Sequence, residues 1–125
     1  MTNPLALIIE DDDQLCEIFS HALKLADFDT EIAQDGQAAL ALLDKVTPAM
    51  VLLDLHLPHV AGDEILRYIR ASKRLEKVRV VLATADQIMA EALQDDVTLI
   101  LLKPISVVQL KILASRIRPH VMTQL

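Results

Sequence analysis

The stretch Met50-Val-Leu-Leu-Asp54-Leu-His-Leu-Pro58 places four apolar residues directly before a carboxylate. A short apolar run without polar alternation predicts a strand that is buried on both faces. Similar runs occur at Leu5–Ile9, Val78–Ala83 and Thr98–Leu102, and polar residues follow each of them. A fifth, less apolar strand is predicted at Thr30–Ala33. The chain therefore carries five short strands, four of which belong inside a sheet.

The segments between these strands have the 3.6-residue apolar period of helices. In the first segment, the apolar positions are Leu15, Ile18, Phe19, Ala22, Leu23 and Ala26. Further helices are expected after Asp35-Gly36, after Gly62 and after Pro104, whereas Asp86–Gln94 predicts a poor or truncated helix. Strands and helices that alternate in this way predict an α/β fold with a doubly wound, five-stranded parallel sheet. No linker or repeat interrupts the pattern, so residues 1–125 are expected to form one domain.

Bulk properties exclude several classes of protein. The net charge of −6 opposes unaided binding to nucleic acid, and no run of Lys and Arg is visible along the chain. The only cysteine, Cys16, cannot form an internal disulfide, and the longest apolar runs are far below the ~20 residues of a membrane span. These features predict a soluble, cytoplasmic protein with no membrane contact.

Polar side chains gather where the apolar strands are predicted to end. Parallel sheets of this class bind ligands beyond the carboxyl ends of their strands. We therefore expect carboxylates, a hydroxyl and an ammonium group to converge at one edge. In chain order they are Glu10, Asp11 and Asp12 after the first strand, and then Asp54, Thr84 and Lys103. Such a cluster of carboxylates requires a cation, and an all-oxygen site suits Mg²⁺. A metal-bound carboxylate can then attack a phosphoryl donor, with Lys103 and Thr84 contacting the transferred group.

Four motifs in this order resemble the receiver domains of two-component response regulators. They are Leu7-Ile-Ile-Glu-Asp-Asp-Asp13, Asp54-Leu-His-Leu-Pro58-His-Val-Ala-Gly62, Leu82-Ala-Thr84-Ala85 and Lys103-Pro104. Each motif alone is weak, but together they cover essentially the whole chain. The resemblance implies the flavodoxin-like (βα)5 fold of the chemotaxis response regulators, with strand order 2-1-3-4-5.

The resemblance also assigns roles to individual residues. Asp54 would be the phosphoacceptor, and Thr84 and Lys103 would bind the phosphoryl group. Mg²⁺, or Mn²⁺ in its place, would be held by Asp11 directly, by Glu10 through water, by Asp54 and by the main-chain carbonyl of His56. The family further implies a cis peptide bond between Lys103 and Pro104.

The family implies partners on both sides of the reaction. A histidine kinase or a histidine phosphotransfer protein would supply the phosphoryl group, and an unidentified downstream protein or effector domain would respond. The domain would dephosphorylate itself rather than act as a turnover enzyme. His56 and Asp86 are expected to flank the path of water to Asp54 and to influence that rate.

Two departures from the family pattern leave other functions open. Ile100 occupies the position, three residues before the lysine, where receivers usually carry Tyr or Phe. Lys103 follows Thr84 by 19 positions, about one helical turn fewer than usual. These changes favour, as an alternative, a pseudo-receiver that binds proteins without regulation by phosphorylation. A phosphatase of the haloacid-dehalogenase type, using Asp11 and Asp13, is a weaker alternative because the chain is short for that fold.

Overall fold

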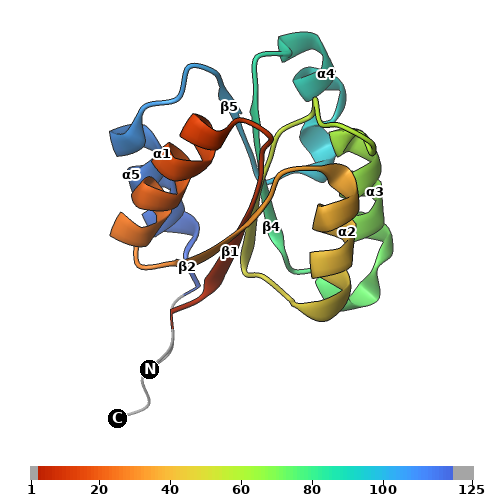
Figure 1. The fold of residues 1–125 in the computed structure, drawn as a ribbon, viewed down its shortest axis with the longest axis horizontal. Coiled ribbons are helices and arrows are strands. Elements are labelled where there is room, and N and C mark those ends of the chain that lie inside the picture. The colour runs from red at the N-terminus through yellow and green to blue at the C-terminus, as the bar shows by residue number, and fades with distance from the viewer. Residues whose placement is uncertain (1–2, 120–125) are drawn as a thin grey trace.

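The computed structural model describes residues 3–119 and shows a parallel sheet of five strands (Figure 1). The strand order is β2-β1-β3-β4-β5, which confirms the order that the resemblance implied. The strands are β1 (Leu5–Ile9), β2 (Asp29–Ala33), β3 (Met50–Leu53), β4 (Arg79–Thr84) and β5 (Leu99–Leu102). All neighbouring strands pair in parallel, so their carboxyl ends lie at one edge of the sheet.

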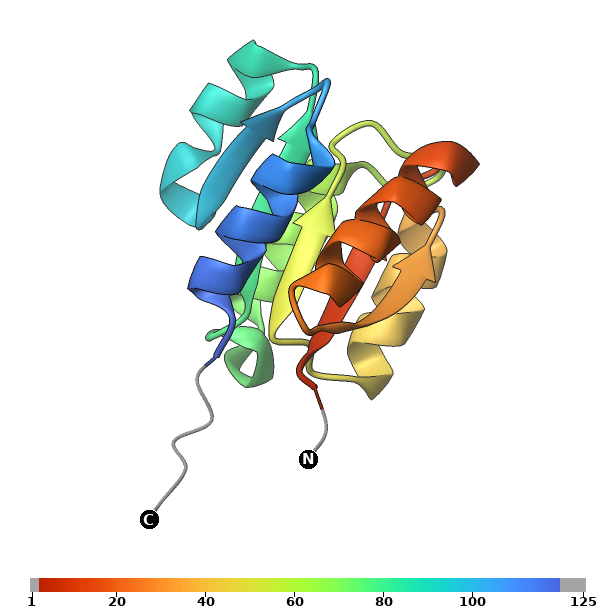
Figure 2. The ribbon, with the colours of Figure 1, turned by 90° about the vertical axis from the view of Figure 1, so that its left-hand side faces the viewer.

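Helices cover both faces of the sheet. One face is covered by α1 (Asp13–Leu25) and α5 (Val107–Ile117), which lie side by side in Figure 2. The other face is covered by α2 (Gly36–Lys45), α3 (Gly62–Ala71) and α4 (Gln87–Ala92). Short 3₁₀ turns at Lys73–Leu75 and Gln94–Asp96 precede β4 and β5. The doubly wound α/β prediction is confirmed.

Two apolar cores follow from the alternation of side chains along each strand. Ile8 packs with Phe19 and Phe28 on the α1 and α5 face. Leu7 and Ile9 pack on the opposite face, against residues of α2 and α3. The central strands are therefore buried from both sides, which explains why their sequences are continuous apolar runs.

Aspartates begin three of the helices by accepting hydrogen bonds from main-chain amides. Asp12 accepts from Leu15 N at 2.9 Å, and Asp35 accepts from Ala38 N at 2.8 Å. Asp86 accepts from the amide of the third residue of α4 at 3.0 Å. Side-chain caps of this kind satisfy amides that the helix itself leaves unpaired. Asp12 thus stabilises α1, while Glu10 and Asp11 remain available to the sheet edge.

The fourth helix is short, as the spacing between Thr84 and Lys103 predicted. It contains six residues and is followed by the 3₁₀ turn Gln94–Asp96. Ile100 of β5 is partly buried against the core on this side of the sheet. Between residues 3 and 119, no helix combines the length and the apolar character needed to cross a membrane.

Candidate functional site

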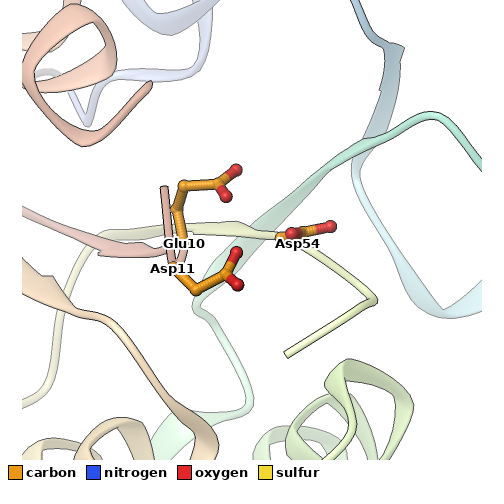
Figure 3. A group of neighbouring side chains, drawn as sticks. All are labelled: Glu10, Asp11 and Asp54. Carbon is orange, nitrogen blue, oxygen red and sulfur yellow. The ribbon is translucent and has the colours of Figure 1, made fainter. Parts of the chain in front are cut away.

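Three carboxylates meet at the carboxyl edge of the sheet (Figure 3). Carboxylate oxygens of Glu10, Asp11 and Asp54 all lie within 4.8 Å of one another. Glu10 and Asp11 follow β1, and Asp54 follows β3. The main chain continues the sheet for one further residue at both places, because Asp54 N donates to Ile9 O at 2.9 Å and Glu10 N donates to Ala33 O at 3.0 Å. The predicted convergence of these acids is confirmed.

Lys103 compensates part of the negative charge in this cluster. Glu10 and Asp54 are only 2 % and 6 % exposed, whereas Asp11 is exposed. The Lys103 Nζ atom lies 2.7 Å from Glu10 Oε1 and 3.6 Å from Asp54 Oδ2. Buried carboxylates require such partners because water cannot solvate them. The lysine therefore bridges the two buried acids.

The pKa values of these groups follow from burial and from their mutual contacts. Burial raises the pKa of Glu10, and the negative charge of Asp54 raises it further, although the hydrogen bond from Lys103 acts in the opposite direction. Burial alone would lower the pKa of Lys103, but its hydrogen bond to Glu10 and the charge of Asp54 raise the pKa above the ordinary lysine value. These contacts therefore favour the charged form of Lys103, whereas burial favours the protonated form of Glu10.

The strands β4 and β5 position Lys103 and Thr84 at the same edge. Lys103 N donates to Thr84 O at 2.9 Å, and the Lys103–Pro104 peptide bond is cis, as the resemblance implied. The buried Thr84 hydroxyl accepts a hydrogen bond from Asp86 N at 3.0 Å. In this structure the hydroxyl thus holds the loop that leads into α4.

His56 contacts both the acidic cluster and the α4 loop. Its main-chain amide donates to Asp54 Oδ1 at 3.3 Å, and its Nε2 atom lies 3.0 Å from Asp86 Oδ2. The amide of Met89 and the His56 ring both lower the pKa of Asp86. The sequence placed His56 and Asp86 near Asp54 but did not predict this pair, because 30 residues separate them. No local sequence pattern signals such a contact.

The three carboxylates are suitable ligands for a divalent cation. Every candidate ligand atom is an oxygen, as hard cations such as Mg²⁺ and Mn²⁺ prefer. Asp11 is exposed beside two buried acids, so waters can complete the coordination of an ion held by few protein ligands. All three carboxylates predicted as metal ligands are therefore close enough to act together.

Comparison with known sequences identifies relatives over most of the chain. The response regulator receiver domain profile matches residues 6–115. The probable methanogenesis regulatory protein FilR2 of Methanothrix harundinacea is 33% identical over 127 residues, covering 93% of this chain and 82% of FilR2. The transcriptional regulatory protein TrcR of Mycobacterium tuberculosis is 44% identical over 66 residues, which are 53% of this chain and 26% of TrcR. The chain thus matches about a quarter of TrcR but most of FilR2.

Solved structures share the same architecture. The chemotaxis response regulator CheY4 of Vibrio cholerae superposes with a TM-score of 0.84 at 23% identity, covering 93% of this chain and 99% of CheY4. The Mn²⁺-bound response regulator Rcp1 gives a TM-score of 0.77 at 27% identity and covers 91% of both chains. The fold, the acidic cluster and the sequence match agree, and this chain belongs to the response regulator receiver domain family of two-component signal transduction.

Proposed function

We propose that Asp54 is the phosphoacceptor of a two-component phosphorelay and that residues 1–125 act as one receiver domain. The observation that carries the proposal is the position of Asp54 beside two further carboxylates, with the Lys103 ammonium 3.6 Å from its Oδ2 atom. This combination supplies a nucleophilic carboxylate, a metal site and a cation for the incoming phosphoryl group. The acidic cluster is complete, so nothing in the site favours the pseudo-receiver alternative.

Each residue of the site would have a separate role in phosphoryl transfer. An Asp54 oxygen attacks the phosphorus of a phosphohistidine donor, and the bond from phosphorus to the histidine nitrogen breaks, which leaves an acyl phosphate on Asp54. Asp11, Asp54 and the His56 carbonyl would hold Mg²⁺, with Glu10 acting through water, and Mn²⁺ could substitute. When bound, the metal neutralises charge on the phosphoryl oxygens. Lys103 offers its ammonium group to the same oxygens.

We infer partners and a cellular location for the domain as well. The donor would be a histidine kinase or a histidine phosphotransfer protein in the cytoplasm. Thr84 would turn its hydroxyl from the Asp86 amide toward the phosphoryl group, and the loop that leads into α4 would follow. A downstream protein or effector domain would read this movement, without direct contact between this domain and nucleic acid. Release of phosphate by water, rather than turnover of a substrate, would reset the switch.

Labelling with a small phosphoryl donor tests whether Asp54 accepts the phosphoryl group. Incubation with acetyl phosphate and Mg²⁺ is expected to add the mass of one phosphoryl group, and Asp54→Asn is expected to abolish the adduct. Asp13→Asn is the matched control because it removes the same charge from an exposed residue of the same acidic run. The absence of an adduct in the wild-type protein, or an adduct that persists in Asp54→Asn, would contradict the proposal.

Mg²⁺ binding is expected to depend on Asp11. Asp11→Asn removes a charged oxygen ligand and should weaken Mg²⁺ binding by about tenfold to a hundredfold. Isothermal titration calorimetry measures the affinity directly, and Asp13→Asn again serves as the charge control. Equal affinities in Asp11→Asn and the control would exclude Asp11 as a ligand.

The pair of His56 and Asp86 is expected to slow the loss of phosphate. The His56 Nε2 atom lies 3.0 Å from Asp86 Oδ2, and the two residues lie in the loops that follow Asp54 and Thr84, so removing either side chain should admit water more freely. His56→Ala and Asp86→Ala should each shorten the phospho-Asp54 lifetime by about threefold or more, without abolishing labelling. His59→Asn is the control, since His59 has a positive φ of 71°, which Asn tolerates. Unchanged lifetimes in both variants would refute this role.

A further inference from the structure

Five basic side chains gather at the edge of the sheet opposite the acidic site. They line a cavity of about 610 Å³ and are Arg74, Lys77, Arg79, Arg116 and Arg118. This edge is where β1 and β4 begin and where α5 ends, at the bottom of Figure 2. Among residues 3–119, no acidic side chain lines the cavity. A chain with a net charge of −6 thus concentrates five of its 12 basic residues in one place.

The positive charge of this basic pocket is not neutralised by ion pairs. Within residues 3–119, none of the carboxylate ion pairs involves any of the five. Arg74 donates to the main-chain oxygens of Leu43 and Val46, and Arg118 donates to Asp27 O. These bonds to uncharged carbonyl groups hold the two guanidinium groups in place while leaving their charge intact.

The other three basic residues are free to meet a ligand. Lys77, Arg79 and Arg116 are exposed, and their side chains make no hydrogen bond within the part of the chain that the structure describes. A helix dipole accounts for Arg116, which lies in the last turn of α5, where cations are favoured. It does not account for Lys77 and Arg79, which precede and begin β4.

The lining of the pocket indicates the chemistry of its ligand. Guanidinium groups match the geometry of phosphate oxygens and bind them with charge-assisted hydrogen bonds. Apolar side chains, among them Pro48, Val78 and Ile117, complete the wall and offer contact to a flat ring. The volume falls in the usual range for small-molecule sites. We propose that this basic pocket binds a nucleotide-sized, phosphate-bearing small molecule, independently of the chemistry at Asp54.

Titration with ADP, followed by ¹H–¹⁵N NMR, tests the proposal on the full chain. EDTA is present so that no metal ion bridges ADP to the acidic cluster, and the ionic strength is kept constant. Saturable shifts are expected at the amides of residues 74–79 and 116–118. Adenosine, which lacks phosphate, is expected to leave these amides unchanged.

Double variants of equal charge distinguish specific ADP binding in the pocket from nonspecific electrostatic attraction to the protein. Lys77→Gln with Arg116→Gln removes two exposed charges from the pocket and is expected to weaken ADP binding by at least about tenfold. Lys24→Gln with Lys111→Gln removes the same charge from exposed positions outside the pocket and should change the affinity by less than about twofold.

Several results would overturn the proposal. ADP could leave the amides of residues 74–79 and 116–118 unshifted, or both double variants could weaken binding equally. Adenosine could shift the same amides as strongly as ADP. A duplex DNA that binds through this edge while ADP does not would replace a small-molecule site with a nucleic-acid surface. Each of these outcomes is distinct from failure at Asp54, because the titration uses neither Mg²⁺ nor a phosphoryl donor.

Discussion

Gly62→Ala is expected to destabilise the domain by about 3 kcal/mol, one of the larger effects that a single methyl group can have. A Cβ atom at this position would lie 2.4 Å from Asp54 O and 2.6 Å from Leu55 Cα. Both are main-chain atoms directly after β3, so neither can move without displacing Asp54. Helix propensity predicts the opposite sign, a gain of about 0.5–1 kcal/mol for alanine over glycine inside a helix. Urea unfolding followed by far-UV circular dichroism decides between the two.

Ala71→Gly is the matched control for this prediction. Ala71 is exposed at the other end of the same helix, and its replacement should cost only about 0.5–1 kcal/mol. One variant replaces glycine with alanine and the other replaces alanine with glycine, so the two differ only in the position and direction of the change. Wild-type stability or a gain in Gly62→Ala would mean that α3 can begin without its close approach to Asp54. Weaker Mg²⁺ binding is expected in Gly62→Ala, because Asp54 must shift to make room.

Sequence patterns were sufficient to predict the sheet and the acidic cluster, for a physical reason. A strand such as Met50–Leu53 lies between two layers of helices, so neither face tolerates polar residues and the sequence becomes a continuous apolar run. Parallel strands end at the same edge, so the residues that follow them must meet there. Glu10 and Asp54 follow neighbouring strands β1 and β3. Their proximity follows from the strand order, which the family resemblance supplied.

The contacts between individual side chains could not be predicted in the same way. Lys103 was expected near the phosphoryl site, but its hydrogen bond to Glu10 joins residues 93 positions apart and depends on the rotamers of both. The pair of His56 and Asp86 depends on the course of two loops. The basic pocket was missed because its residues come from two segments far apart in the chain, residues 74–79 and 116–118, which only the fold brings together.

The two departures from the family pattern, Ile100 and the short α4, do not involve the residues of the acidic cluster. Ile100 has an aliphatic side chain, partly buried, on the same side of the sheet as the six-residue α4. Two apolar side chains are exposed on α4 and on β5, the strand that follows it: Ile88 is 84% exposed and Leu102 is 44% exposed. The acidic cluster carries none of these changes. Under the proposed function, any readout on this side of the sheet would proceed without an aromatic ring at position 100.

Lys103→Met is expected to destabilise the metal-free domain by about 2–4 kcal/mol, because it leaves buried carboxylates without their cation. Glu10 and Asp54, at 2 % and 6 % exposed, would then repel each other without the bridge that Lys103 provides. The pKa of Glu10, already raised by burial, should rise further. Native Glu10 then binds a proton more readily than the unfolded chain does, so the loss of stability should shrink as the pH falls through this raised pKa.

Mg²⁺ should restore much of the stability of Lys103→Met, because a divalent cation can replace the missing charge between Glu10 and Asp54. Labelling by acetyl phosphate should nevertheless remain slow, since the metal does not replace the ammonium group beside Asp54. Urea midpoints with and without Mg²⁺ measure the first effect, and the rate of mass increase measures the second. Lys24→Met, an exposed lysine outside the site, is the control and should change neither. A wild-type midpoint for Lys103→Met in EDTA would show that the two buried acids do not need the lysine for stability.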